Sequence, residues 1–446
     1  MEANGMKAID REDEAKILGS AVGALRRVMC LVVGSIFVVS QSAFADVFLV
    51  PKQKKLSEPS PTVQSGVSPL SPGSLLGGTA GSGSDRVWRI KPGFKFDSSF
   101  DTNINRERPG RRDEDIILTY APSIKVMRHG TRVGVEGNYT FAFQQFLRDS
   151  DQSHFDHTFD GRIKYTGNRL NATLGGNSAF VETYASSEQS ERRSLWINGV
   201  SPEIAYRLTP KLSASALYRN HYFDYRDVTF SDLSYWSHDT GGRIYYHATP
   251  KLDFYTEGVW TVIDYWRSGV YDADGFSATG GAVGRMTPKL VVDLGAGFKG
   301  HFYDNSTINS YKDWIVLGSL GYRLSPKIDL SLYGKRDKNE SVYRNVGWFR
   351  SHELGLGITY RMPYRTTFGI SGSIQNNRYS RETTEGPDTK KRSDFIYAGG
   401  SSLSWSPIEY VSLAVGYGIR KRTTNFDDLF GYLAHSFDGS VSCSFG

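Results

Sequence analysis

The sequence has few cysteines and only a small excess of positive over negative charge. Each of these shortages excludes a class of protein. Only two of the 446 residues are cysteine, Cys30 and Cys443. Because Cys30 lies in a leader that we expect to be removed, the mature chain should have neither an intrachain disulfide nor a cysteine-rich metal site. The net charge is +6, from 53 basic and 47 acidic residues. This excess is too small and too dispersed for nucleic-acid binding, so we expect no nucleic-acid partner.

Long apolar runs are also missing. After residue 45 no run approaches the roughly 18 residues that a membrane helix needs, and the mean hydropathy is −0.40. This test does not detect membrane strands, because lipid-facing and lumen-facing residues alternate along them and average to a polar value.

Catalytic motifs are absent as well: the sequence has no GxSxG, no HExxH and no P-loop. We therefore predict a protein that is not an enzyme and needs no cofactor. "HFDH" (154–157), expected in an outer loop, could hold a metal but is better explained as solvated loop residues. "YDADGF" (271–276) resembles the start of a calcium loop, but its glycine comes too early and the distal glutamate is missing. We expect no metal at either place.

The first 85 residues look like targeting and spacer sequence. Arg26 and Arg27 precede an apolar segment, 28–39, and "AFA" at 43–45 fits a cleavage site. We predict that 1–45 is a signal peptide with an extended basic region, since the apolar segment is too short for a membrane anchor. Residues 46–85, rich in Ser, Pro and Gly, should form a disordered periplasmic linker. Uniform composition then predicts one domain over 86–446.

A short motif recurs through this domain. "LTPKL", "ATPKL", "MTPKL" and "LSPKI" place a proline after Ser or Thr and before Lys, and the series continues with two looser members. The prolines are Pro210, Pro250, Pro288, Pro326, Pro363 and Pro407. "RHGTR" near His129 and "TGNRL" near Asn168 extend the series backward. Proline presets φ for a tight turn and cannot donate to a strand ladder, so each motif predicts a short hairpin turn.

The segments between the turns alternate between apolar and polar residues. In 290–302, for example, Leu290, Val292, Leu294, Ala296 and Phe298 alternate with polar or small residues. A period of two over ten or more residues indicates a β-strand with one apolar face. Longer polar stretches, such as 224–235 and 378–394, separate the other ends of the segments. Short turns on one rim and long loops on the other are typical of membrane barrels.

Three all-β architectures compete for this pattern. A propeller also repeats near 40 residues but needs a turn every eight to ten, and here turns come about every 19. A secreted sandwich or solenoid normally uses strands of about five or six residues. A transmembrane up-and-down antiparallel β-barrel needs about 9–11 residues per strand, which these segments supply. Eight short turns with a first and a last strand give 18 strands, or 16 if one of the two weak turns is misread.

Aromatic residues near the turns support the barrel. Tyr206, Tyr246, Tyr322 and Tyr360 lie three or four residues before their turn prolines, where an interfacial girdle would lie. Ordinary strand preference for tyrosine is the alternative explanation. The C-terminal "HSFDGSVSCSFG" places Phe445 at the end of an apolar face, which resembles the signal read by the barrel-assembly machinery, although Gly446 follows it.

The polar face of the strands would line a lumen, which is too wide at this strand number for side chains to fill. The candidate pore-lining residues are Asp253, Glu257, Asp293, Lys299, Asp329, Lys335 and Arg420. Both signs of charge occur, which suits polar neutral or mixed-charge solutes. These residues could equally be simple solvated strand faces. The expected surroundings are outer-membrane lipid and lipopolysaccharide.

The rhythm of "YRLTPKLSASALYRN", "YRLSPKIDLSLYGKRD" and "LSWSPIEYVSLAVGYGIRKR" resembles the putative beta-barrel porin 2 family over about 86–446. The resemblance implies a barrel in the outer membrane of a Gram-negative bacterium, often associated with exopolysaccharide production or export. It implies no catalytic residues. Two functions stay open: a channel for polar solutes or polysaccharide, and a non-conducting structural or adhesive barrel that acts through its surface loops.

Overall fold

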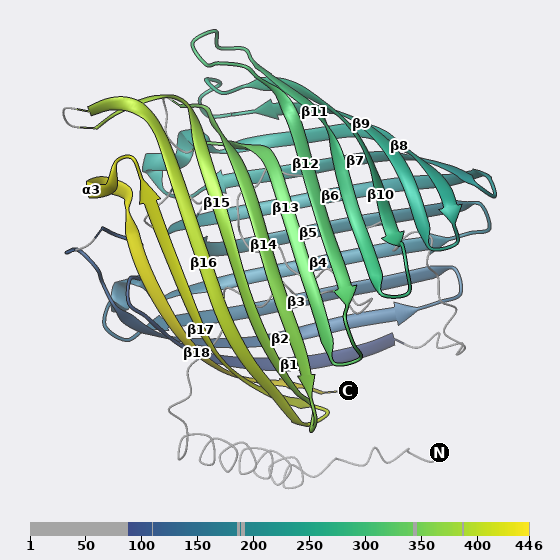
Figure 1. Ribbon diagram of the computed structural model, residues 1–446, viewed down its shortest axis with the longest axis horizontal. Coiled ribbons are helices and arrows are strands. Elements are labelled where there is room, and N and C mark those ends of the chain that lie inside the picture. The colour runs from purple at the N-terminus through teal and green to yellow at the C-terminus, as the bar shows by residue number, and fades with distance from the viewer. Residues whose placement is uncertain are drawn as a thin grey trace, which may run out of the picture. The chain divides into compact units, whose positions relative to one another are not determined.

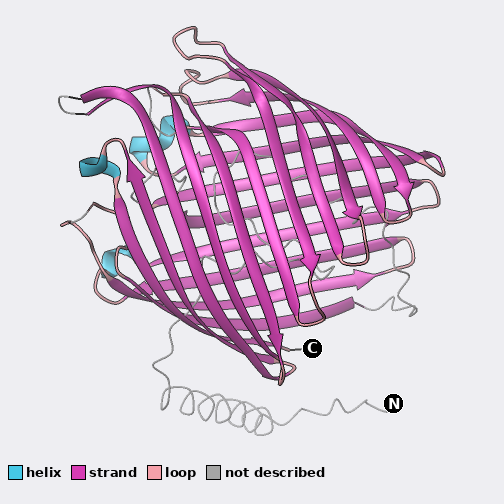
Figure 2. Ribbon diagram, in the orientation of Figure 1, coloured by secondary structure: helices cyan, strands magenta, loops and turns pink. Residues whose placement is uncertain are grey.

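The computed structural model describes residues 88–108, 110–184, 188, 192–341, 346–385 and 388–445. Eighteen strands make up most of these residues (Figures 1 and 2). The expected signal peptide and linker lie outside the described residues. In the described part of the chain, no helix combines the length and apolar character needed to cross a membrane.

The strands follow one another along the chain with lengths of 13 to 21 residues. Their bounds are β1 Trp88–Asp101, β2 Asp115–His129, β3 Val133–Phe146, β4 His154–Thr166, β5 Leu170–Thr183, β6 Arg193–Thr209, β7 Leu212–Tyr225, β8 Tyr235–Thr249, β9 Leu252–Asp264, β10 Ala273–Arg285, β11 Leu290–Tyr303, β12 Tyr311–Arg323, β13 Ile328–Glu340, β14 Trp348–Met362, β15 Thr366–Glu385, β16 Asp388–Ile408, β17 Val411–Thr424 and β18 Tyr432–Ser444.

Each strand pairs antiparallel with its neighbours in sequence, and the first strand also pairs with the last. In that closing pair Phe94 lies opposite Cys443, and β1 pairs with β2 along its other edge. The sheet therefore closes into a ring in which every strand has a neighbour on both sides, as Figure 1 shows with β12–β17 in front of β2–β6. The predicted antiparallel all-β barrel is confirmed, and its strand number is 18.

The repeated Ser/Thr-Pro-Lys motifs form short turns at one rim, as predicted. In four of these turns the hydroxyl of the Ser or Thr accepts a hydrogen bond from the Lys backbone N–H, each at 3.2 Å. The hydroxyl residues are Thr209, Thr249, Thr287 and Ser325. The motif therefore combines a proline that fixes φ with a side chain that satisfies a turn N–H. The turn after Pro363 differs, since Tyr364 and Arg365 both adopt positive φ, at 58° and 56°.

The connections at the other rim are longer and carry three short helices: η1 Ser150–Gln152, η2 Val228–Leu233 and α3 Asp427–Phe430. One expected loop is wrong. The polar stretch 378–394 is mostly strand, because β15 continues to Glu385 and β16 begins at Asp388. Backbone pairing such as Thr384 with Thr389 maintains this hairpin without an apolar face. Alternation in the sequence therefore does not mark where these two strands end.

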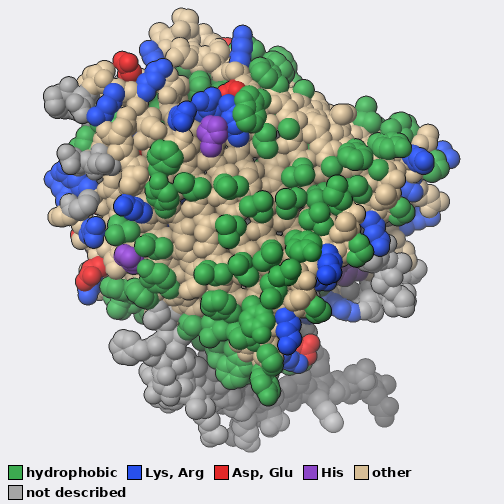
Figure 3. Space-filling model, viewed as in Figure 1, with side chains coloured by type: hydrophobic (Ala, Val, Ile, Leu, Met, Phe, Trp, Pro, Cys, Tyr) green, Lys and Arg blue, Asp and Glu red, His purple; other side chains and the backbone are tan. Residues whose placement is uncertain are grey.

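The outward face of the barrel is apolar and carries aromatic residues near both rims. Along β6, Tyr206 near the short turn and Trp196 near the long loop both point outward, and Tyr246 and Trp236 repeat this on β8. Each pair is ten residues apart. At about 3.3 Å per residue and a tilt of about 45°, the two levels are about 23 Å apart. This height matches the apolar band of about 25 Å in membrane barrels. Figure 3 shows hydrophobic side chains across the visible wall.

Adjacent positions on one strand should differ in how much an added charge lowers the free energy of unfolding. Leu332 is 41% exposed on the outward face near the middle of β13, and Ser331 points inward. We expect Leu332→Arg to lower the free energy of unfolding by about 2–4 kcal/mol, because an arginine at mid-bilayer is poorly solvated. Ser331→Arg, the matched control, should change it little. Urea titration of protein folded into liposomes, followed by tryptophan fluorescence, measures both; equal losses would contradict the assignment of faces.

Candidate functional site: the inward face of the barrel

The inward face is identified by contacts that pass over an intervening strand, which a concave surface brings within reach. Arg219 on β7 and Glu257 on β9 approach to 3.7 Å between Nη2 and Oε2. Lys299 on β11 and Asp337 on β13 approach to 3.0 Å between Nζ and Oδ1. These residues alternate along their strands with the exposed apolar set. The polar set therefore faces the lumen.

All seven candidate pore-lining residues lie on this inward face, at strand positions that alternate with the outward apolar residues. They are Asp253, Glu257, Asp293, Lys299, Asp329, Lys335 and Arg420. The structure spreads them over four strands, β9, β11, β13 and β17, and brings only some of them to common partners. Their contribution to conduction stays a prediction.

Two of the seven lie near the short-turn rim in ion pairs. Asp253 accepts from His247 Nδ1 at 2.7 Å, and the other ring nitrogen of His247 is 2.8 Å from the Ser213 hydroxyl. Asp329 pairs with Arg323 at 3.3 Å and also contacts the guanidinium of Arg361. Both carboxylates are thus held by basic side chains from neighbouring strands.

The others lie deeper in the barrel. Lys335 has Asp337 and Glu353 as electrostatic neighbours, and Asp293 acts in the same way on Tyr255. Arg420 hydrogen-bonds with the side chain of Tyr432 on the next strand. The lumen wall therefore carries charges of both signs that lie close to one another, and not a ring of side chains with one sign of charge.

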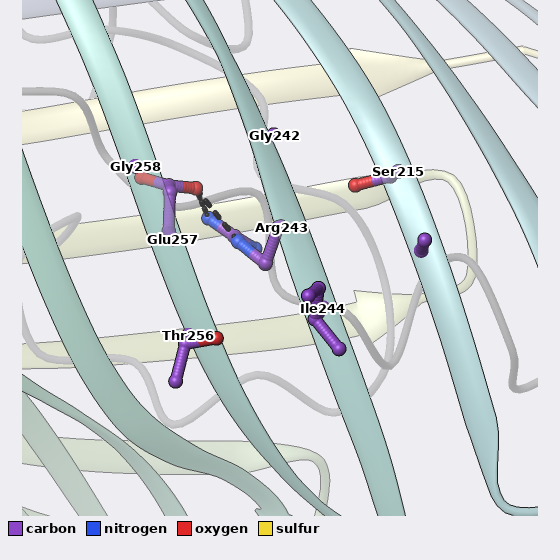
Figure 4. A pocket seen from close by; sticks show the side chains of 8 residues that line it. Ser215, Gly242, Arg243, Ile244, Thr256, Glu257 and Gly258 are labelled. Carbon is purple, nitrogen blue, oxygen red and sulfur yellow. Dashed lines mark hydrogen bonds and ion pairs between the residues drawn. The ribbon is translucent and has the colours of Figure 1, made fainter.

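Arg243 forms an enclosed charge network on the wall, and it was not among the residues that the sequence pattern singled out. Its Nε donates to Glu257 Oε2 at 2.7 Å and its Nη1 donates to the Tyr245 hydroxyl at 2.9 Å. The guanidinium also lies 4.9 Å from the ring centre of Tyr255. The alternation of 235–249 places Arg243 inward, so the signal was present. Figure 4 shows Arg243 and Glu257 reaching toward each other from adjacent strands.

A shallow pocket adjoins this pair but belongs to the other face of the wall. Its lining includes Ala214, Gly242, Ile244, Thr256 and Gly258 (Figure 4). These five residues alternate with the inward set. Gly242 and Gly258 also pair directly, so no side chain fills the space between their neighbours. The pocket is therefore a depression in the outward surface, where glycines expose the backbone, and not a solute site.

At the long-loop end the inward face becomes apolar. Side chains from six neighbouring strands, β5 to β10, and from the loops beside them form one buried cluster with residues of β11 and the β11–β12 connection. Its members are Val181, Leu195, Phe223, Tyr225, Leu233, Tyr235, Ile263, Tyr265, Tyr271, Ala273, Tyr303 and Ile308. The lumen is thus filled by side chains along this part of its wall, which strand periodicity did not reveal.

The outer end of β13 also enters the lumen here. Lys338 is fully buried, and its Nζ lies 3.0 Å from Nδ1 of His301 on β11. The Tyr303 hydroxyl donates to Glu340 Oε2 at 2.8 Å. Because His301 and Tyr303 belong to the inward face of β11, this part of β13 lies inside the ring.

Glu188 connects opposite sides of the lumen. It lies between β5 and β6 in the chain and is fully buried. Its Oε1 accepts from the Ser341 hydroxyl at 2.7 Å, just after β13. Its backbone oxygen accepts from Arg422 Nη1 on β17 at 3.1 Å. These partners are six to seven strands away around an 18-strand ring, so Glu188 lies inside the ring and occupies part of the lumen at this level.

The possible metal ligands of "HFDH" do not come together, and their placement in a loop was wrong. Residues 154–157 begin β4. His154 Nδ1 is hydrogen-bonded to the Gln152 backbone oxygen at 2.6 Å. His157 points outward, and its Nδ1 lies 2.8 Å from the Tyr139 hydroxyl. Because side chains alternate along the strand, His154 and His157 lie on opposite faces of β4. Among the described residues no group of three or more His, Cys, Asp or Glu could hold a metal.

The four girdle tyrosines are exposed on the outward face near the short turns, at 43% for Tyr206, 48% for Tyr246, 38% for Tyr322 and 37% for Tyr360. Phe445 is 54% exposed, and its N–H donates to the Pro92 backbone oxygen at 3.0 Å. These positions are compatible with the predicted interfacial and assembly roles, which stay predictions.

A closed antiparallel ring with an apolar outside and a charged inside has the architecture of a porin-like barrel. The family model of putative beta-barrel porin 2 matches residues 76–441. The chain belongs to this family, as its turn rhythm suggested. No curated protein is similar enough in sequence to count as a relative.

Several solved outer-membrane structures are similar in shape at low identity. OccAB3 of Acinetobacter baumannii has a TM-score of 0.45 at 10% identity, with 80% of this chain and 99% of that chain covered. The outer membrane protein OpdK of Pseudomonas aeruginosa has a TM-score of 0.45 at 8% identity, with 80% and 98% covered. The siderophore receptor PirA of P. aeruginosa has a TM-score of 0.40 at 10% identity, with 80% and 81% covered.

The enclosed Arg243 network should be more sensitive to the loss of one partner than an exposed ion pair of the same wall. Glu257→Gln leaves the Arg243 guanidinium, whose side chain is 2% exposed, without its carboxylate. We expect the free energy of unfolding to fall by about 3 kcal/mol. Arg323→Gln is the control, since its side chain is 54% exposed and Asp329 keeps Arg361; it should cost less than about 1 kcal/mol. Equal effects in liposome unfolding titrations would contradict an enclosed network.

Proposed function

We propose that this protein is a channel in the outer membrane of a Gram-negative bacterium and that polar solutes cross through its lumen. The observation that carries the proposal is the division of one closed ring into an apolar outward face and a charged inward face. A ring of 16–18 strands leaves room for an aqueous path. Short turns would face the periplasm and long loops the exterior.

The wall chemistry favours solutes that are polar and neutral or carry both signs of charge. Its charges are mostly paired, as in Asp253 with His247 and Glu257 with Arg243. Such a wall offers many hydrogen-bonding groups but little net field along the path. A sugar or a polysaccharide segment has matching chemistry. A role in exopolysaccharide export, which the family resemblance implies, is the more specific form of this proposal.

The alternative is a non-conducting barrel that acts through its surface loops. The buried aromatic cluster and the buried Glu188 favour it, because both occupy the lumen at the loop end. The two functions differ in one measurable property, which is whether ions pass through the folded barrel.

Single-channel recording of residues 46–446, refolded and inserted in a planar bilayer, tests the channel. We expect discrete, stable current steps. Glu188→Ala should give larger steps, because it removes a buried carboxylate from the lumen together with its contact to Ser341. The matched control is Glu114→Ala, which removes the same charge from a surface pair with Arg148.

Silence from correctly folded protein, for both the wild type and Glu188→Ala, would reject the channel in favour of the structural barrel. Folding is checked independently by strand content in circular dichroism and by the gel mobility change on heating. Block of the current by added oligosaccharide would support the polysaccharide form of the proposal.

A further inference from the structure

Three arginines and a histidine gather on the outward wall at the loop end of β13–β15. Arg336, Arg350, His352 and Arg378 occupy positions that continue the outward apolar set of their strands. In Figure 3 blue and purple side chains lie together over the upper ends of these strands, within a wall that is otherwise green and tan. A group of cations on the face that carries apolar residues elsewhere needs an explanation.

The cluster lies where β12 and β13 stop pairing with each other in the barrel wall. Pairing between β12 and β13 ends with Val316 opposite Arg336, although β12 begins at Tyr311 and β13 continues to Glu340. The end of β13 turns into the lumen, as its contacts with His301 and Tyr303 show. Arg336 fills the resulting gap: its Nη1 contacts the backbone oxygen of Trp314 on the unpaired edge.

Two arginines share one carboxylate in this gap. Arg336 Nη2 lies 2.7 Å and Arg350 Nη1 lies 2.6 Å from Asp313 Oδ2. The Arg336 guanidinium lies 3.6 Å from the ring centre of Trp314. Both Nε atoms are buried and have no hydrogen-bond acceptor among the residues that the structure describes. The site therefore has more donors than the protein satisfies.

The charge balance is positive. Arg336, Arg350 and Arg378 all act electrostatically on His352, and Asp313 is the carboxylate that opposes them. Arg378 is exposed and donates to Asn376 at 3.1 Å, a neutral partner. Three guanidinium groups thus have one carboxylate near them, and Asp313 reaches two of them through the gap between β12 and β13 from an inward position of β12. Clustered, incompletely compensated guanidinium groups are suited to bind phosphate, which accepts their forked donors in pairs.

The height of the cluster identifies the kind of ligand. On β14, Tyr360 of the turn-end girdle and Arg350 are ten residues apart, the same spacing as between the two aromatic levels on β6. The cluster therefore lies at the headgroup level of the leaflet on the loop side. Bilayer headgroups are the anions found at this level on an outward wall, and basic pockets on membrane proteins bind them.

We propose that Arg336, Arg350, Arg378 and His352 form a binding site for the phosphate of a phosphorylated glycolipid in the outer leaflet. The inference rests on the proposed orientation, with long loops outward. In this arrangement the acyl chains lie along the apolar wall of β12–β15, and Arg350 and Arg378 contact the phosphate. Arg336 holds Arg350 in place through Asp313.

Native mass spectrometry of the detergent-solubilised barrel with bis-phosphorylated lipid A tests the site. We expect Arg350→Gln with Arg378→Gln to reduce apparent affinity at least tenfold, and exposed Arg378→Gln alone to reduce it by a smaller factor. The control, Lys251→Gln with Lys289→Gln, removes the same charge from the opposite rim and should leave affinity unchanged. Equal loss in the control would reject a local site.

Ligand variants identify the source of the phosphate. Lipid A without phosphate should bind at least tenfold more weakly to the wild type, and millimolar inorganic phosphate should not displace the intact lipid. Equal binding of the phosphate-free lipid, or displacement by free phosphate, would overturn the proposal. Conductance of the double variant should match the wild type, so failure of the lipid site and failure of the channel can be told apart.

Discussion

Backbone hydrogen bonding is the constraint on which the rest of this structure depends. Lipid offers no partner to an exposed N–H or C=O, so a sheet can cross it only if every strand has a neighbour on both sides. The pairing of β1 with both β2 and β18 meets this requirement. Closure then divides the side chains into two sets, because alternate residues must point into the ring or out of it.

The two faces obey different physical rules. Outside, residues such as Leu356 and Trp260 are more than half exposed in the protein alone, which is stable only when lipid covers them. Inside, the concave surface brings alternate strands within reach of each other, so Arg219 can meet Glu257 and Lys299 can meet Asp337. The charges of the lumen are therefore mostly neutralised by partners on the wall itself.

The interruption of pairing between β12 and β13 connects the two faces. By leaving the wall, the end of β13 brings Lys338 and Glu340 into the lumen and leaves a backbone edge on β12. Arg336 caps that edge at Trp314, and the cations around it become available on the outward surface. One local departure from ideal pairing thus accounts for both a narrowed lumen and a charged patch in an apolar wall.

The sequence alone determined the architecture, since the period of two, the Ser/Thr-Pro-Lys turns and the outward position of Tyr206 are local properties readable from neighbouring residues. It also located the inward face, including Asp253 and Arg420. Tertiary structure decided the rest. The 378–394 hairpin extends beyond the residues whose alternation marks a strand. Glu188 contacts two residues, Ser341 and Arg422, that lie 153 and 234 positions further along the sequence. Such contacts depend on how a closed ring folds its loops inward, and no local periodicity records that.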